Sequence, residues 1–140
     1  MRWLNKILGK AELLPCIELA HTRGYTHAIV GEASYQDNIE KIVGGKGQYS
    51  AKYECMATLE CENNNPHDEN AVAVKIGKRL VGYLAREDAA SYRSELQSID
   101  ASLPLAQVRA KIVGGWRDAE SEGHFGVKLN LKRPLQKAKN

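Results

Sequence analysis

The chain has 140 residues, 43% hydrophobic and 26% charged, which is enough to bury the core of one globular domain without disulfide or metal staples. Its apolar runs are too short to cross a bilayer, and its basic start lacks the hydrophobic stretch of a signal peptide. Three cysteines, an odd number without disulfide-like spacing, suit a reducing compartment. We therefore expect an intracellular, cytoplasmic protein that does not use a membrane.

The net charge of +3 is unevenly distributed. Residues 1–24 carry four lysines or arginines against two acids, and residues 113–140 carry six against three. The centre, residues 25–112, carries ten against twelve. Proteins that grip duplex phosphate without reading sequence usually present a broad basic face, because counterion release supplies the affinity. Any nucleic-acid binding by this chain is therefore expected to depend on a local site.

The first 24 residues are predicted to form an apolar and basic N-terminal extension. Its short helical stripe consists of Trp3, Leu4, Ile7 and Leu8. Pro15 prevents one long helix across the segment. Such a stripe packs on its own domain, docks on a partner protein or touches a membrane surface, and packing is the commonest outcome.

A strand is expected at residues 27–30, ending at Gly31. Ser34 is placed to cap a helix that stops at Gly44 and Gly45. The apolar side chains of this helix recur at helical spacing, at Tyr35, Ile39, Ile42 and Val43.

The remaining elements alternate apolar and polar residues with the period of a half-buried strand. Strands are predicted at residues 52–62, 71–76, 80–84, 106–112 and 125–131, with a hairpin turn at 77–79 and a second helix at 86–99. One β core should bury Cys55, Leu59, Val72, Val74, Val108, Ile112, Val127 and Leu129. Asn130 falls on the polar face of the last strand, and residues 135–140 are expected to fray.

Five or six short strands with two modest helices favour a mainly β fold, a small curled sheet or barrel, over a doubly wound sheet. Small open barrels of this type bind oligonucleotides across one face and its bordering loops.

The polar loop at residues 64–70 is the most informative segment. Proline fixes one φ, and Asn and Asp side chains hydrogen-bond neighbouring backbone, so the loop is rigid without a helix or a ladder. Two interpretations stay open: the loop holds an acceptor in place for a ligand, or it is an Asx-type turn whose polar groups satisfy only themselves.

The sequence contains no convincing motif for catalysis or for metal binding. The glycine-rich stretch at 44–50 leaves a helix and enters a strand, the reverse of a phosphate-binding P-loop. Cys55 and Cys61 lie roughly 20 Å apart on one strand and cannot share a zinc ion. We expect no enzyme activity, no cofactor and no metal.

The chain resembles the HIRAN domain family. The resemblance runs from about Ala28 to Leu131, and it rests on residues 29–36, 65–74, 81–86, 114–115 and 123–129. Its most specific part is an N-P-x-D-x-N-A-[VI]-x-V string followed by V-G-[YH]-L. The resemblance implies a modified OB-like or SH3-like small β-barrel over residues 25–132, between the N-terminal extension and a basic tail at 133–140.

The resemblance also implies a partner, single-stranded DNA or its 3′-hydroxyl end, in DNA repair or processing. In the best-understood eukaryotic members the domain is attached to helicase-like ATPases, whose motifs are absent from these 140 residues. The matching positions for DNA binding are Tyr35, Asn65, His67, Asp68, Tyr83, Arg86 and Phe125. Ala33 and Ser34 stand where end-binding members have an arginine and a second tyrosine.

Each position also has a structural interpretation: Tyr35 as a core residue of the helix, Phe125 as a core residue of the sheet, and Asp68 as a turn brace. The rival function is a protein-interaction adaptor that uses the barrel as a scaffold and residues 1–24 to dock on a partner protein. The missing arginine at Ala33 and the acidic centre favour the adaptor, whereas the polar loop with Tyr83 and Arg86 favours DNA.

Overall fold

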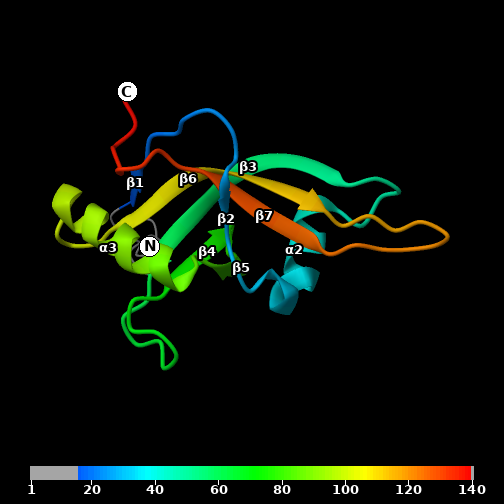
Figure 1. The fold of residues 1–140 in the computed structure, drawn as a ribbon, viewed down its shortest axis with the longest axis horizontal. Helices are drawn as coiled ribbons and strands as arrows, with labels where there is room; N and C mark the ends of the chain where they lie inside the picture. Colours follow the sequence, from blue (N-terminus) through cyan, green and yellow to red (C-terminus); the bar gives the residue numbers. More distant parts are fainter. Residues whose placement is uncertain (1–15, 140) are drawn as a thin grey trace, which may run out of the picture.

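The computed structural model of the protein describes residues 16–139, which form one curled sheet with two helices (Figure 1). The strands are β1 (Cys16–Glu18), β2 (His27–Ala28), β3 (Ala51–Cys61), β4 (Val72–Ile76), β5 (Arg79–Tyr83), β6 (Leu105–Gly114) and β7 (Phe125–Asn130). The helical elements are the 3₁₀ turn η1 (Glu32–Tyr35), α2 (Gln36–Val43) and α3 (Arg86–Ile99). The prediction of a mainly β fold with two helices is confirmed. The N-terminal stripe, Trp3 to Leu8, lies outside the described residues.

The sheet has the order β2-β7-β6-β3-β4-β5, antiparallel throughout, and β1 adds in parallel to β6. Its spine is the long β3–β6 pair, and β6 and β7 continue together into the projecting hairpin of Figure 1. The two ends of the sheet meet just beyond β2. There Val30 and Tyr83 exchange two backbone hydrogen bonds of 2.8 and 2.9 Å.

Gly82 makes this meeting possible. A Cβ on Gly82 would lie 2.6 Å from the Val30 carbonyl oxygen and 2.8 Å from the Ile29 side chain. Only a residue without a side chain lets the two backbones approach this closely.

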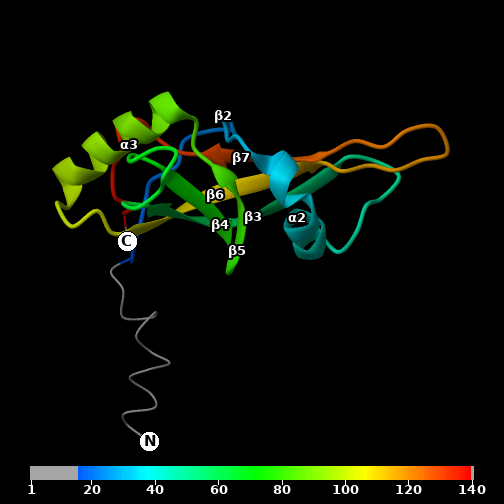
Figure 2. The same ribbon diagram turned by 90° about the horizontal axis from the view of Figure 1, so that it is seen from below.

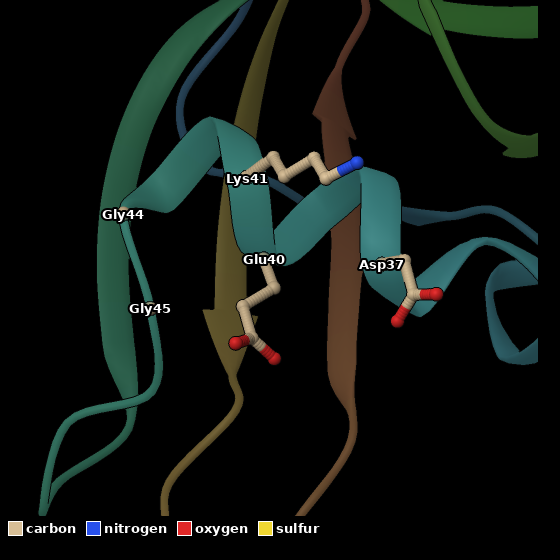
Figure 3. Close-up of a pocket in the computed structure, with 5 residues that line it drawn as sticks. All are labelled: Asp37, Glu40, Lys41, Gly44 and Gly45. Atoms are coloured by element: carbon tan, nitrogen blue, oxygen red, sulfur yellow. The ribbon is translucent and has the colours of Figure 1, made fainter.

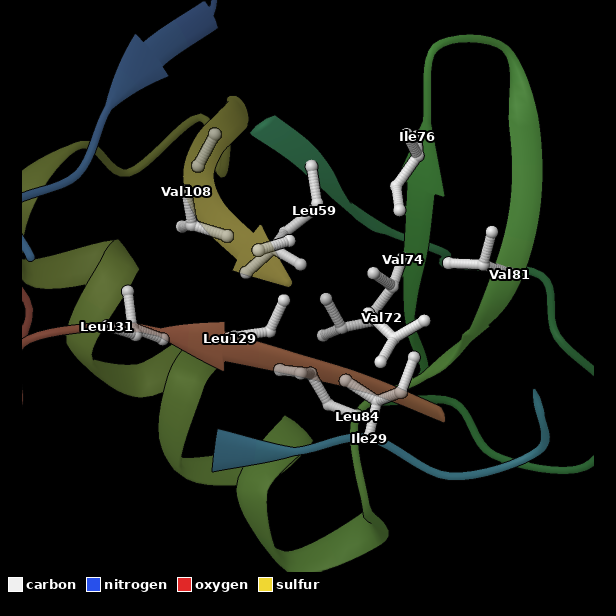
Figure 4. Close-up of a cluster of buried hydrophobic side chains, with 14 of the residues drawn as sticks. Ile29, Leu59, Val72, Val74, Ile76, Val81, Leu84, Val108, Leu129 and Leu131 are labelled. Atoms are coloured by element: carbon white, nitrogen blue, oxygen red, sulfur yellow. The ribbon is translucent and has the colours of Figure 1, made fainter. Parts of the chain in front are cut away.

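The core lies inside the curl (Figure 4). Seven of the eight predicted core residues are at most 1% exposed, and only Cys55 is half-buried. Strand alternation therefore assigned the two faces of the sheet correctly.

The helices follow the predicted pattern with one correction. α3 spans Arg86–Ile99 as predicted, and α2 ends at Gly44, whose φ is 97°. Ser34 does not cap α2, which begins only at Gln36 and has no side-chain cap. The Gln36 side chain instead exchanges two hydrogen bonds, of 2.8 and 2.9 Å, with the backbone of Phe125, which fixes the helix start on β7.

Two predictions for the end of the chain are wrong. The tail is not frayed up to residue 139: Leu135 is 6% exposed, and the Ala138 N–H donates to the Glu18 carbonyl at 2.8 Å. Asn130 is buried rather than solvent-facing, because the segment after β1 crosses over it. Its side chain accepts from the Thr22 N–H at 2.8 Å and donates to the Thr22 carbonyl at 3.0 Å. No helix of residues 16–139 has the length and hydrophobicity needed to cross a membrane.

Tyr92 on α3 yields a stability prediction. Its side chain is fully buried, and no group among residues 16–139 hydrogen-bonds to its hydroxyl. Because an unpaired buried hydroxyl costs on the order of 1–3 kcal/mol, Tyr92→Phe should leave stability unchanged or raise it by about 1 kcal/mol. Urea denaturation checks this, with Tyr92→Leu as the cavity-forming control that should destabilise. A large loss of stability in Tyr92→Phe would mean that the hydroxyl has a partner.

Candidate functional site

A pocket of about 380 Å³ opens at the seam where the two ends of the sheet meet. Its walls come from four separate parts of the chain: the segment just after β2, the end of η1, the β3–β4 loop, and the junction between β5 and α3. Figures 1 and 2 show where these segments lie in the fold. The lining residues are Val30, Tyr35, Asn65, His67, Asp68, Ala71, Tyr83, Leu84 and Arg86. Six of the seven residues singled out from the sequence thus border one concave surface.

The seam explains why the two tyrosines are neighbours. Val30 pairs with Tyr83, and Gly31 then turns the chain with a φ of 83°, so that η1 delivers Tyr35 to the same place. Val30 remains 46% exposed beside them. The pocket lining therefore combines two aromatic side chains with the exposed apolar side chain of Val30.

The β3–β4 loop is braced by its own amide. The Asn65 side-chain oxygen accepts from the backbone N–H groups of His67 and Asp68, at 2.8 and 3.2 Å. Its side-chain nitrogen donates to the Glu62 carboxylate at 3.0 Å. Asn65 thus shapes the loop, as the Asx-turn interpretation proposed.

Asp68 combines both interpretations of the loop. One carboxylate oxygen accepts from the Asn70 N–H at 2.9 Å and braces the turn. The other lies 3.9 Å from the Arg86 Nε atom and retains capacity to accept from a ligand. The side chain is 20% exposed, so the carboxylate is presented from a sheltered position.

Neutral, acidic and basic groups occupy different positions in and around the pocket. Burial, followed by the Glu62 carboxylate and the Tyr35 hydroxyl, raises the pKa of Tyr83 to about 12, so its phenol stays neutral and able to donate. Arg86 lies at the rim with a side chain that is 74% exposed, and it donates to the His67 carbonyl at 2.9 Å. The pocket lining therefore contains one carboxylate, Asp68, with Glu62 behind Tyr83 and Asn65, and one exposed guanidinium, Arg86.

Arg93 is a site-shaping residue that sequence reasoning missed. From α3 its guanidinium donates to the backbone carbonyls of Glu62, Asn70 and Ala71, at 2.7, 2.9 and 2.9 Å. A fourth bond, of 3.1 Å, reaches the Asn63 side chain. The sequence shows only that Arg93 flanks the apolar stripe of the predicted helix, between Ala89 and Leu96, and this position does not reveal which loop it reaches.

Phe125 does not line the pocket. Its ring is 2% exposed, and a Cβ on Gly115 would lie 2.0 Å from it. It points to the same side of β7 as Val127 and Leu129, because residues two apart on a strand share a face. The structural interpretation, a core residue of the sheet, describes Phe125.

Another hollow lies at the end of α2, bordered by Asp37, Glu40, Lys41, Gly44 and Gly45. Its three charged side chains spread outward from the helix and do not converge on one point (Figure 3). This arrangement offers no shared focus for a ligand.

No protein-family model, curated protein or solved structure gives a significant match to this chain. The site must therefore be interpreted from its own geometry.

Arg93 provides a test of how the pocket is held. Arg93→Met keeps the apolar stem but leaves the Glu62 and Asn70 carbonyls without their donor, while Ala71 keeps the Glu62 N–H, and should cost on the order of 2 kcal/mol of folding free energy. Amide hydrogen exchange in residues 63–70 should accelerate more than in β6. The control is Arg79→Met, because the exposed Arg79 side chain makes no hydrogen bond or ion pair within residues 16–139. Equal exchange in the two variants would show that the loop does not depend on Arg93.

Proposed function

We propose that this protein is a non-enzymatic nucleic-acid-binding module, a HIRAN-like domain with a modified OB-like or SH3-like barrel, whose seam pocket receives the 3′-hydroxyl end of single-stranded DNA. The observation that carries the proposal is the convergence of Tyr35, Asp68, Tyr83 and Arg86 on one pocket from four separate elements. Asn65 and His67 complete its loop wall.

The shape of the pocket suits one terminal nucleoside. About 380 Å³ is at the small end of ligand pockets, and the Tyr35 and Tyr83 rings with Val30 offer apolar surface to a base or sugar. Stacking on such rings tolerates any base and is typically worth about 1–3 kcal/mol per base. Binding at this pocket should therefore be largely independent of sequence.

The positions of Asp68 and Arg86 favour one kind of DNA end, a 3′-hydroxyl, over a 3′-phosphate. A terminal hydroxyl is a donor, and the open oxygen of Asp68 is an acceptor. A phosphate in the same place would meet the Asp68 carboxylate as a like charge, with the Glu62 carboxylate behind Asn65 adding to the repulsion. The preceding phosphate would instead lie near the rim, where Arg86 is exposed. This order of charges favours a free 3′-hydroxyl over a phosphorylated end or a continuous strand.

Asp68→Asn tests the proposed preference for a 3′-hydroxyl over a 3′-phosphate end. The amide keeps an oxygen for the Asn70 N–H, so the turn survives while the charge disappears. Wild type should bind a short 3′-hydroxyl strand more tightly than its 3′-phosphate counterpart by about 1–2 kcal/mol, a like-charge effect of ordinary size. The variant should narrow this gap, measured by fluorescence anisotropy.

The control for this measurement is Asp37→Asn, which removes an exposed carboxylate on α2, outside the pocket. It should leave the preference for the 3′-hydroxyl end intact. The proposed end recognition is refuted if wild type binds both ends equally.

Ala33→Arg tests the absent phosphate clamp. Ala33 is exposed within η1, two residues before Tyr35, so an arginine side chain has room there. The variant should bind single-stranded DNA more tightly, and the slope of log affinity against log salt should steepen by about one unit. If wild type binds no single strand at low salt and this variant changes nothing, the protein-interaction adaptor replaces DNA binding as the better hypothesis.

A further inference from the structure

The outward face of the sheet carries a cluster of cations that the pocket does not use. Lys52 projects from β3, Arg109 and Lys111 from β6, and Lys128 from β7, all on the side opposite the core. Lys111 is paired in register with Lys128, and Arg109 is its next neighbour on the same face of β6. We call these four residues the basic face.

The cations of the basic face form no ion pair within the described residues. Within residues 16–139 their side chains make no hydrogen bond and no ion pair, and Lys111 lies 5.8 Å from the centre of the Tyr25 ring. Two acids share this face: Glu54, the cross-strand partner of Lys111, keeps its charge while accepting from the Tyr25 hydroxyl at 2.7 Å, and Glu60 pairs with Lys75 at 2.7 Å. The local positive charge is therefore only partly offset.

A hollow of about 340 Å³ extends the basic face at one end. It lies between the sheet and two crossing segments, with Arg109 and Met56 on the sheet side and His21 and Lys139 among the residues opposite. Glu18 is its one acidic lining residue. The positive surface thus continues from Lys128 through Arg109 toward the C-terminal segment.

We propose that the basic face binds the phosphate backbone of double-stranded DNA. Lysine and arginine on a sheet face can contact phosphates without reading bases, and among residues 16–139 the ring on this face, Tyr25, is held by Glu54 and Lys111. Those features suit a duplex better than a single strand. This inference goes beyond the seam pocket, since β6 lies in the middle of the sheet order and the seam joins its ends.

A membrane surface fits less well. Met56 is the one large apolar side chain on this face that is substantially exposed within the described residues, which leaves little to insert between lipids.

The test uses a blunt 20-base-pair duplex with phosphorylated 3′ ends, which offers no free 3′-hydroxyl end to the pocket. Wild type should bind it with a strong salt dependence. Arg109→Gln/Lys128→Gln should weaken binding roughly tenfold and reduce the log–log salt slope by about two units, because two cations no longer neutralise a phosphate each. The control Lys41→Gln/Lys78→Gln removes the same charge from two exposed sites, on α2 and in the β4–β5 turn. It should change neither the affinity for the duplex nor the salt slope.

Separate variants distinguish duplex binding at the basic face from 3′-end binding in the pocket. Asp68→Asn should leave duplex binding unchanged, and the Arg109/Lys128 variant should retain any preference between 3′-hydroxyl and 3′-phosphate single strands. The inference is overturned if wild type does not bind the duplex at low salt, or if both double variants lose binding equally, which would indicate a net-charge effect. It is also overturned if the Arg109/Lys128 variant loses binding to vesicles containing phosphatidylserine but not to DNA.

Discussion

The backbone pair between Val30 and Tyr83 is the constraint on which the rest of the structure depends. These residues follow β2 and end β5, the two strands farthest apart in the sheet order, and their pairing joins the edges of the curled sheet. A glycine at position 82 is required because any side chain would strike the Val30 carbonyl. The same junction fixes the site, since it sets Tyr35 beside Tyr83. Without it these side chains would belong to opposite ends of the sheet.

The β3–β4 loop shows how a binding surface can be built from groups that also hold the backbone. The Asn65 side-chain oxygen accepts two backbone hydrogen bonds within the turn. One Asp68 oxygen accepts a further bond there, while the other stays available. From α3, Arg93 donates to three backbone carbonyls. Buried or half-buried carbonyls without donors are costly, so such a loop is stiff. Stiffness keeps the carboxylate in place before any ligand arrives, which lowers the entropy cost of binding.

Charge in this protein is sorted by face rather than by sequence region. The central residues are slightly acidic as a whole, which from composition argued against a basic surface. Strand alternation nonetheless gathers Arg109, Lys111 and Lys128 outside the sheet, with Glu54 as the acid opposite Lys111, whereas Asp68 lies in the seam pocket. A regional sum averages over these two surfaces, whereas a ligand meets only one of them. The two proposed contacts with DNA accordingly use different chemistry, hydroxyl recognition at one and phosphate attraction at the other.

The sequence by itself determined which residues face the core and where most elements lie. Alternation of apolar residues identified the strands, α3 was predicted from Arg86 to Ile99, and Gly44 ended α2, because side-chain periodicity and left-handed glycines act over a few neighbouring residues. The polar loop was recognisable for the same local reason. Only the tertiary structure decided the meeting of Val30 with Tyr83, the reach of Arg93 into the loop and the burial of Asn130 beneath Thr22. Those contacts join segments distant along the chain, and their energy exists only once the sheet has curled.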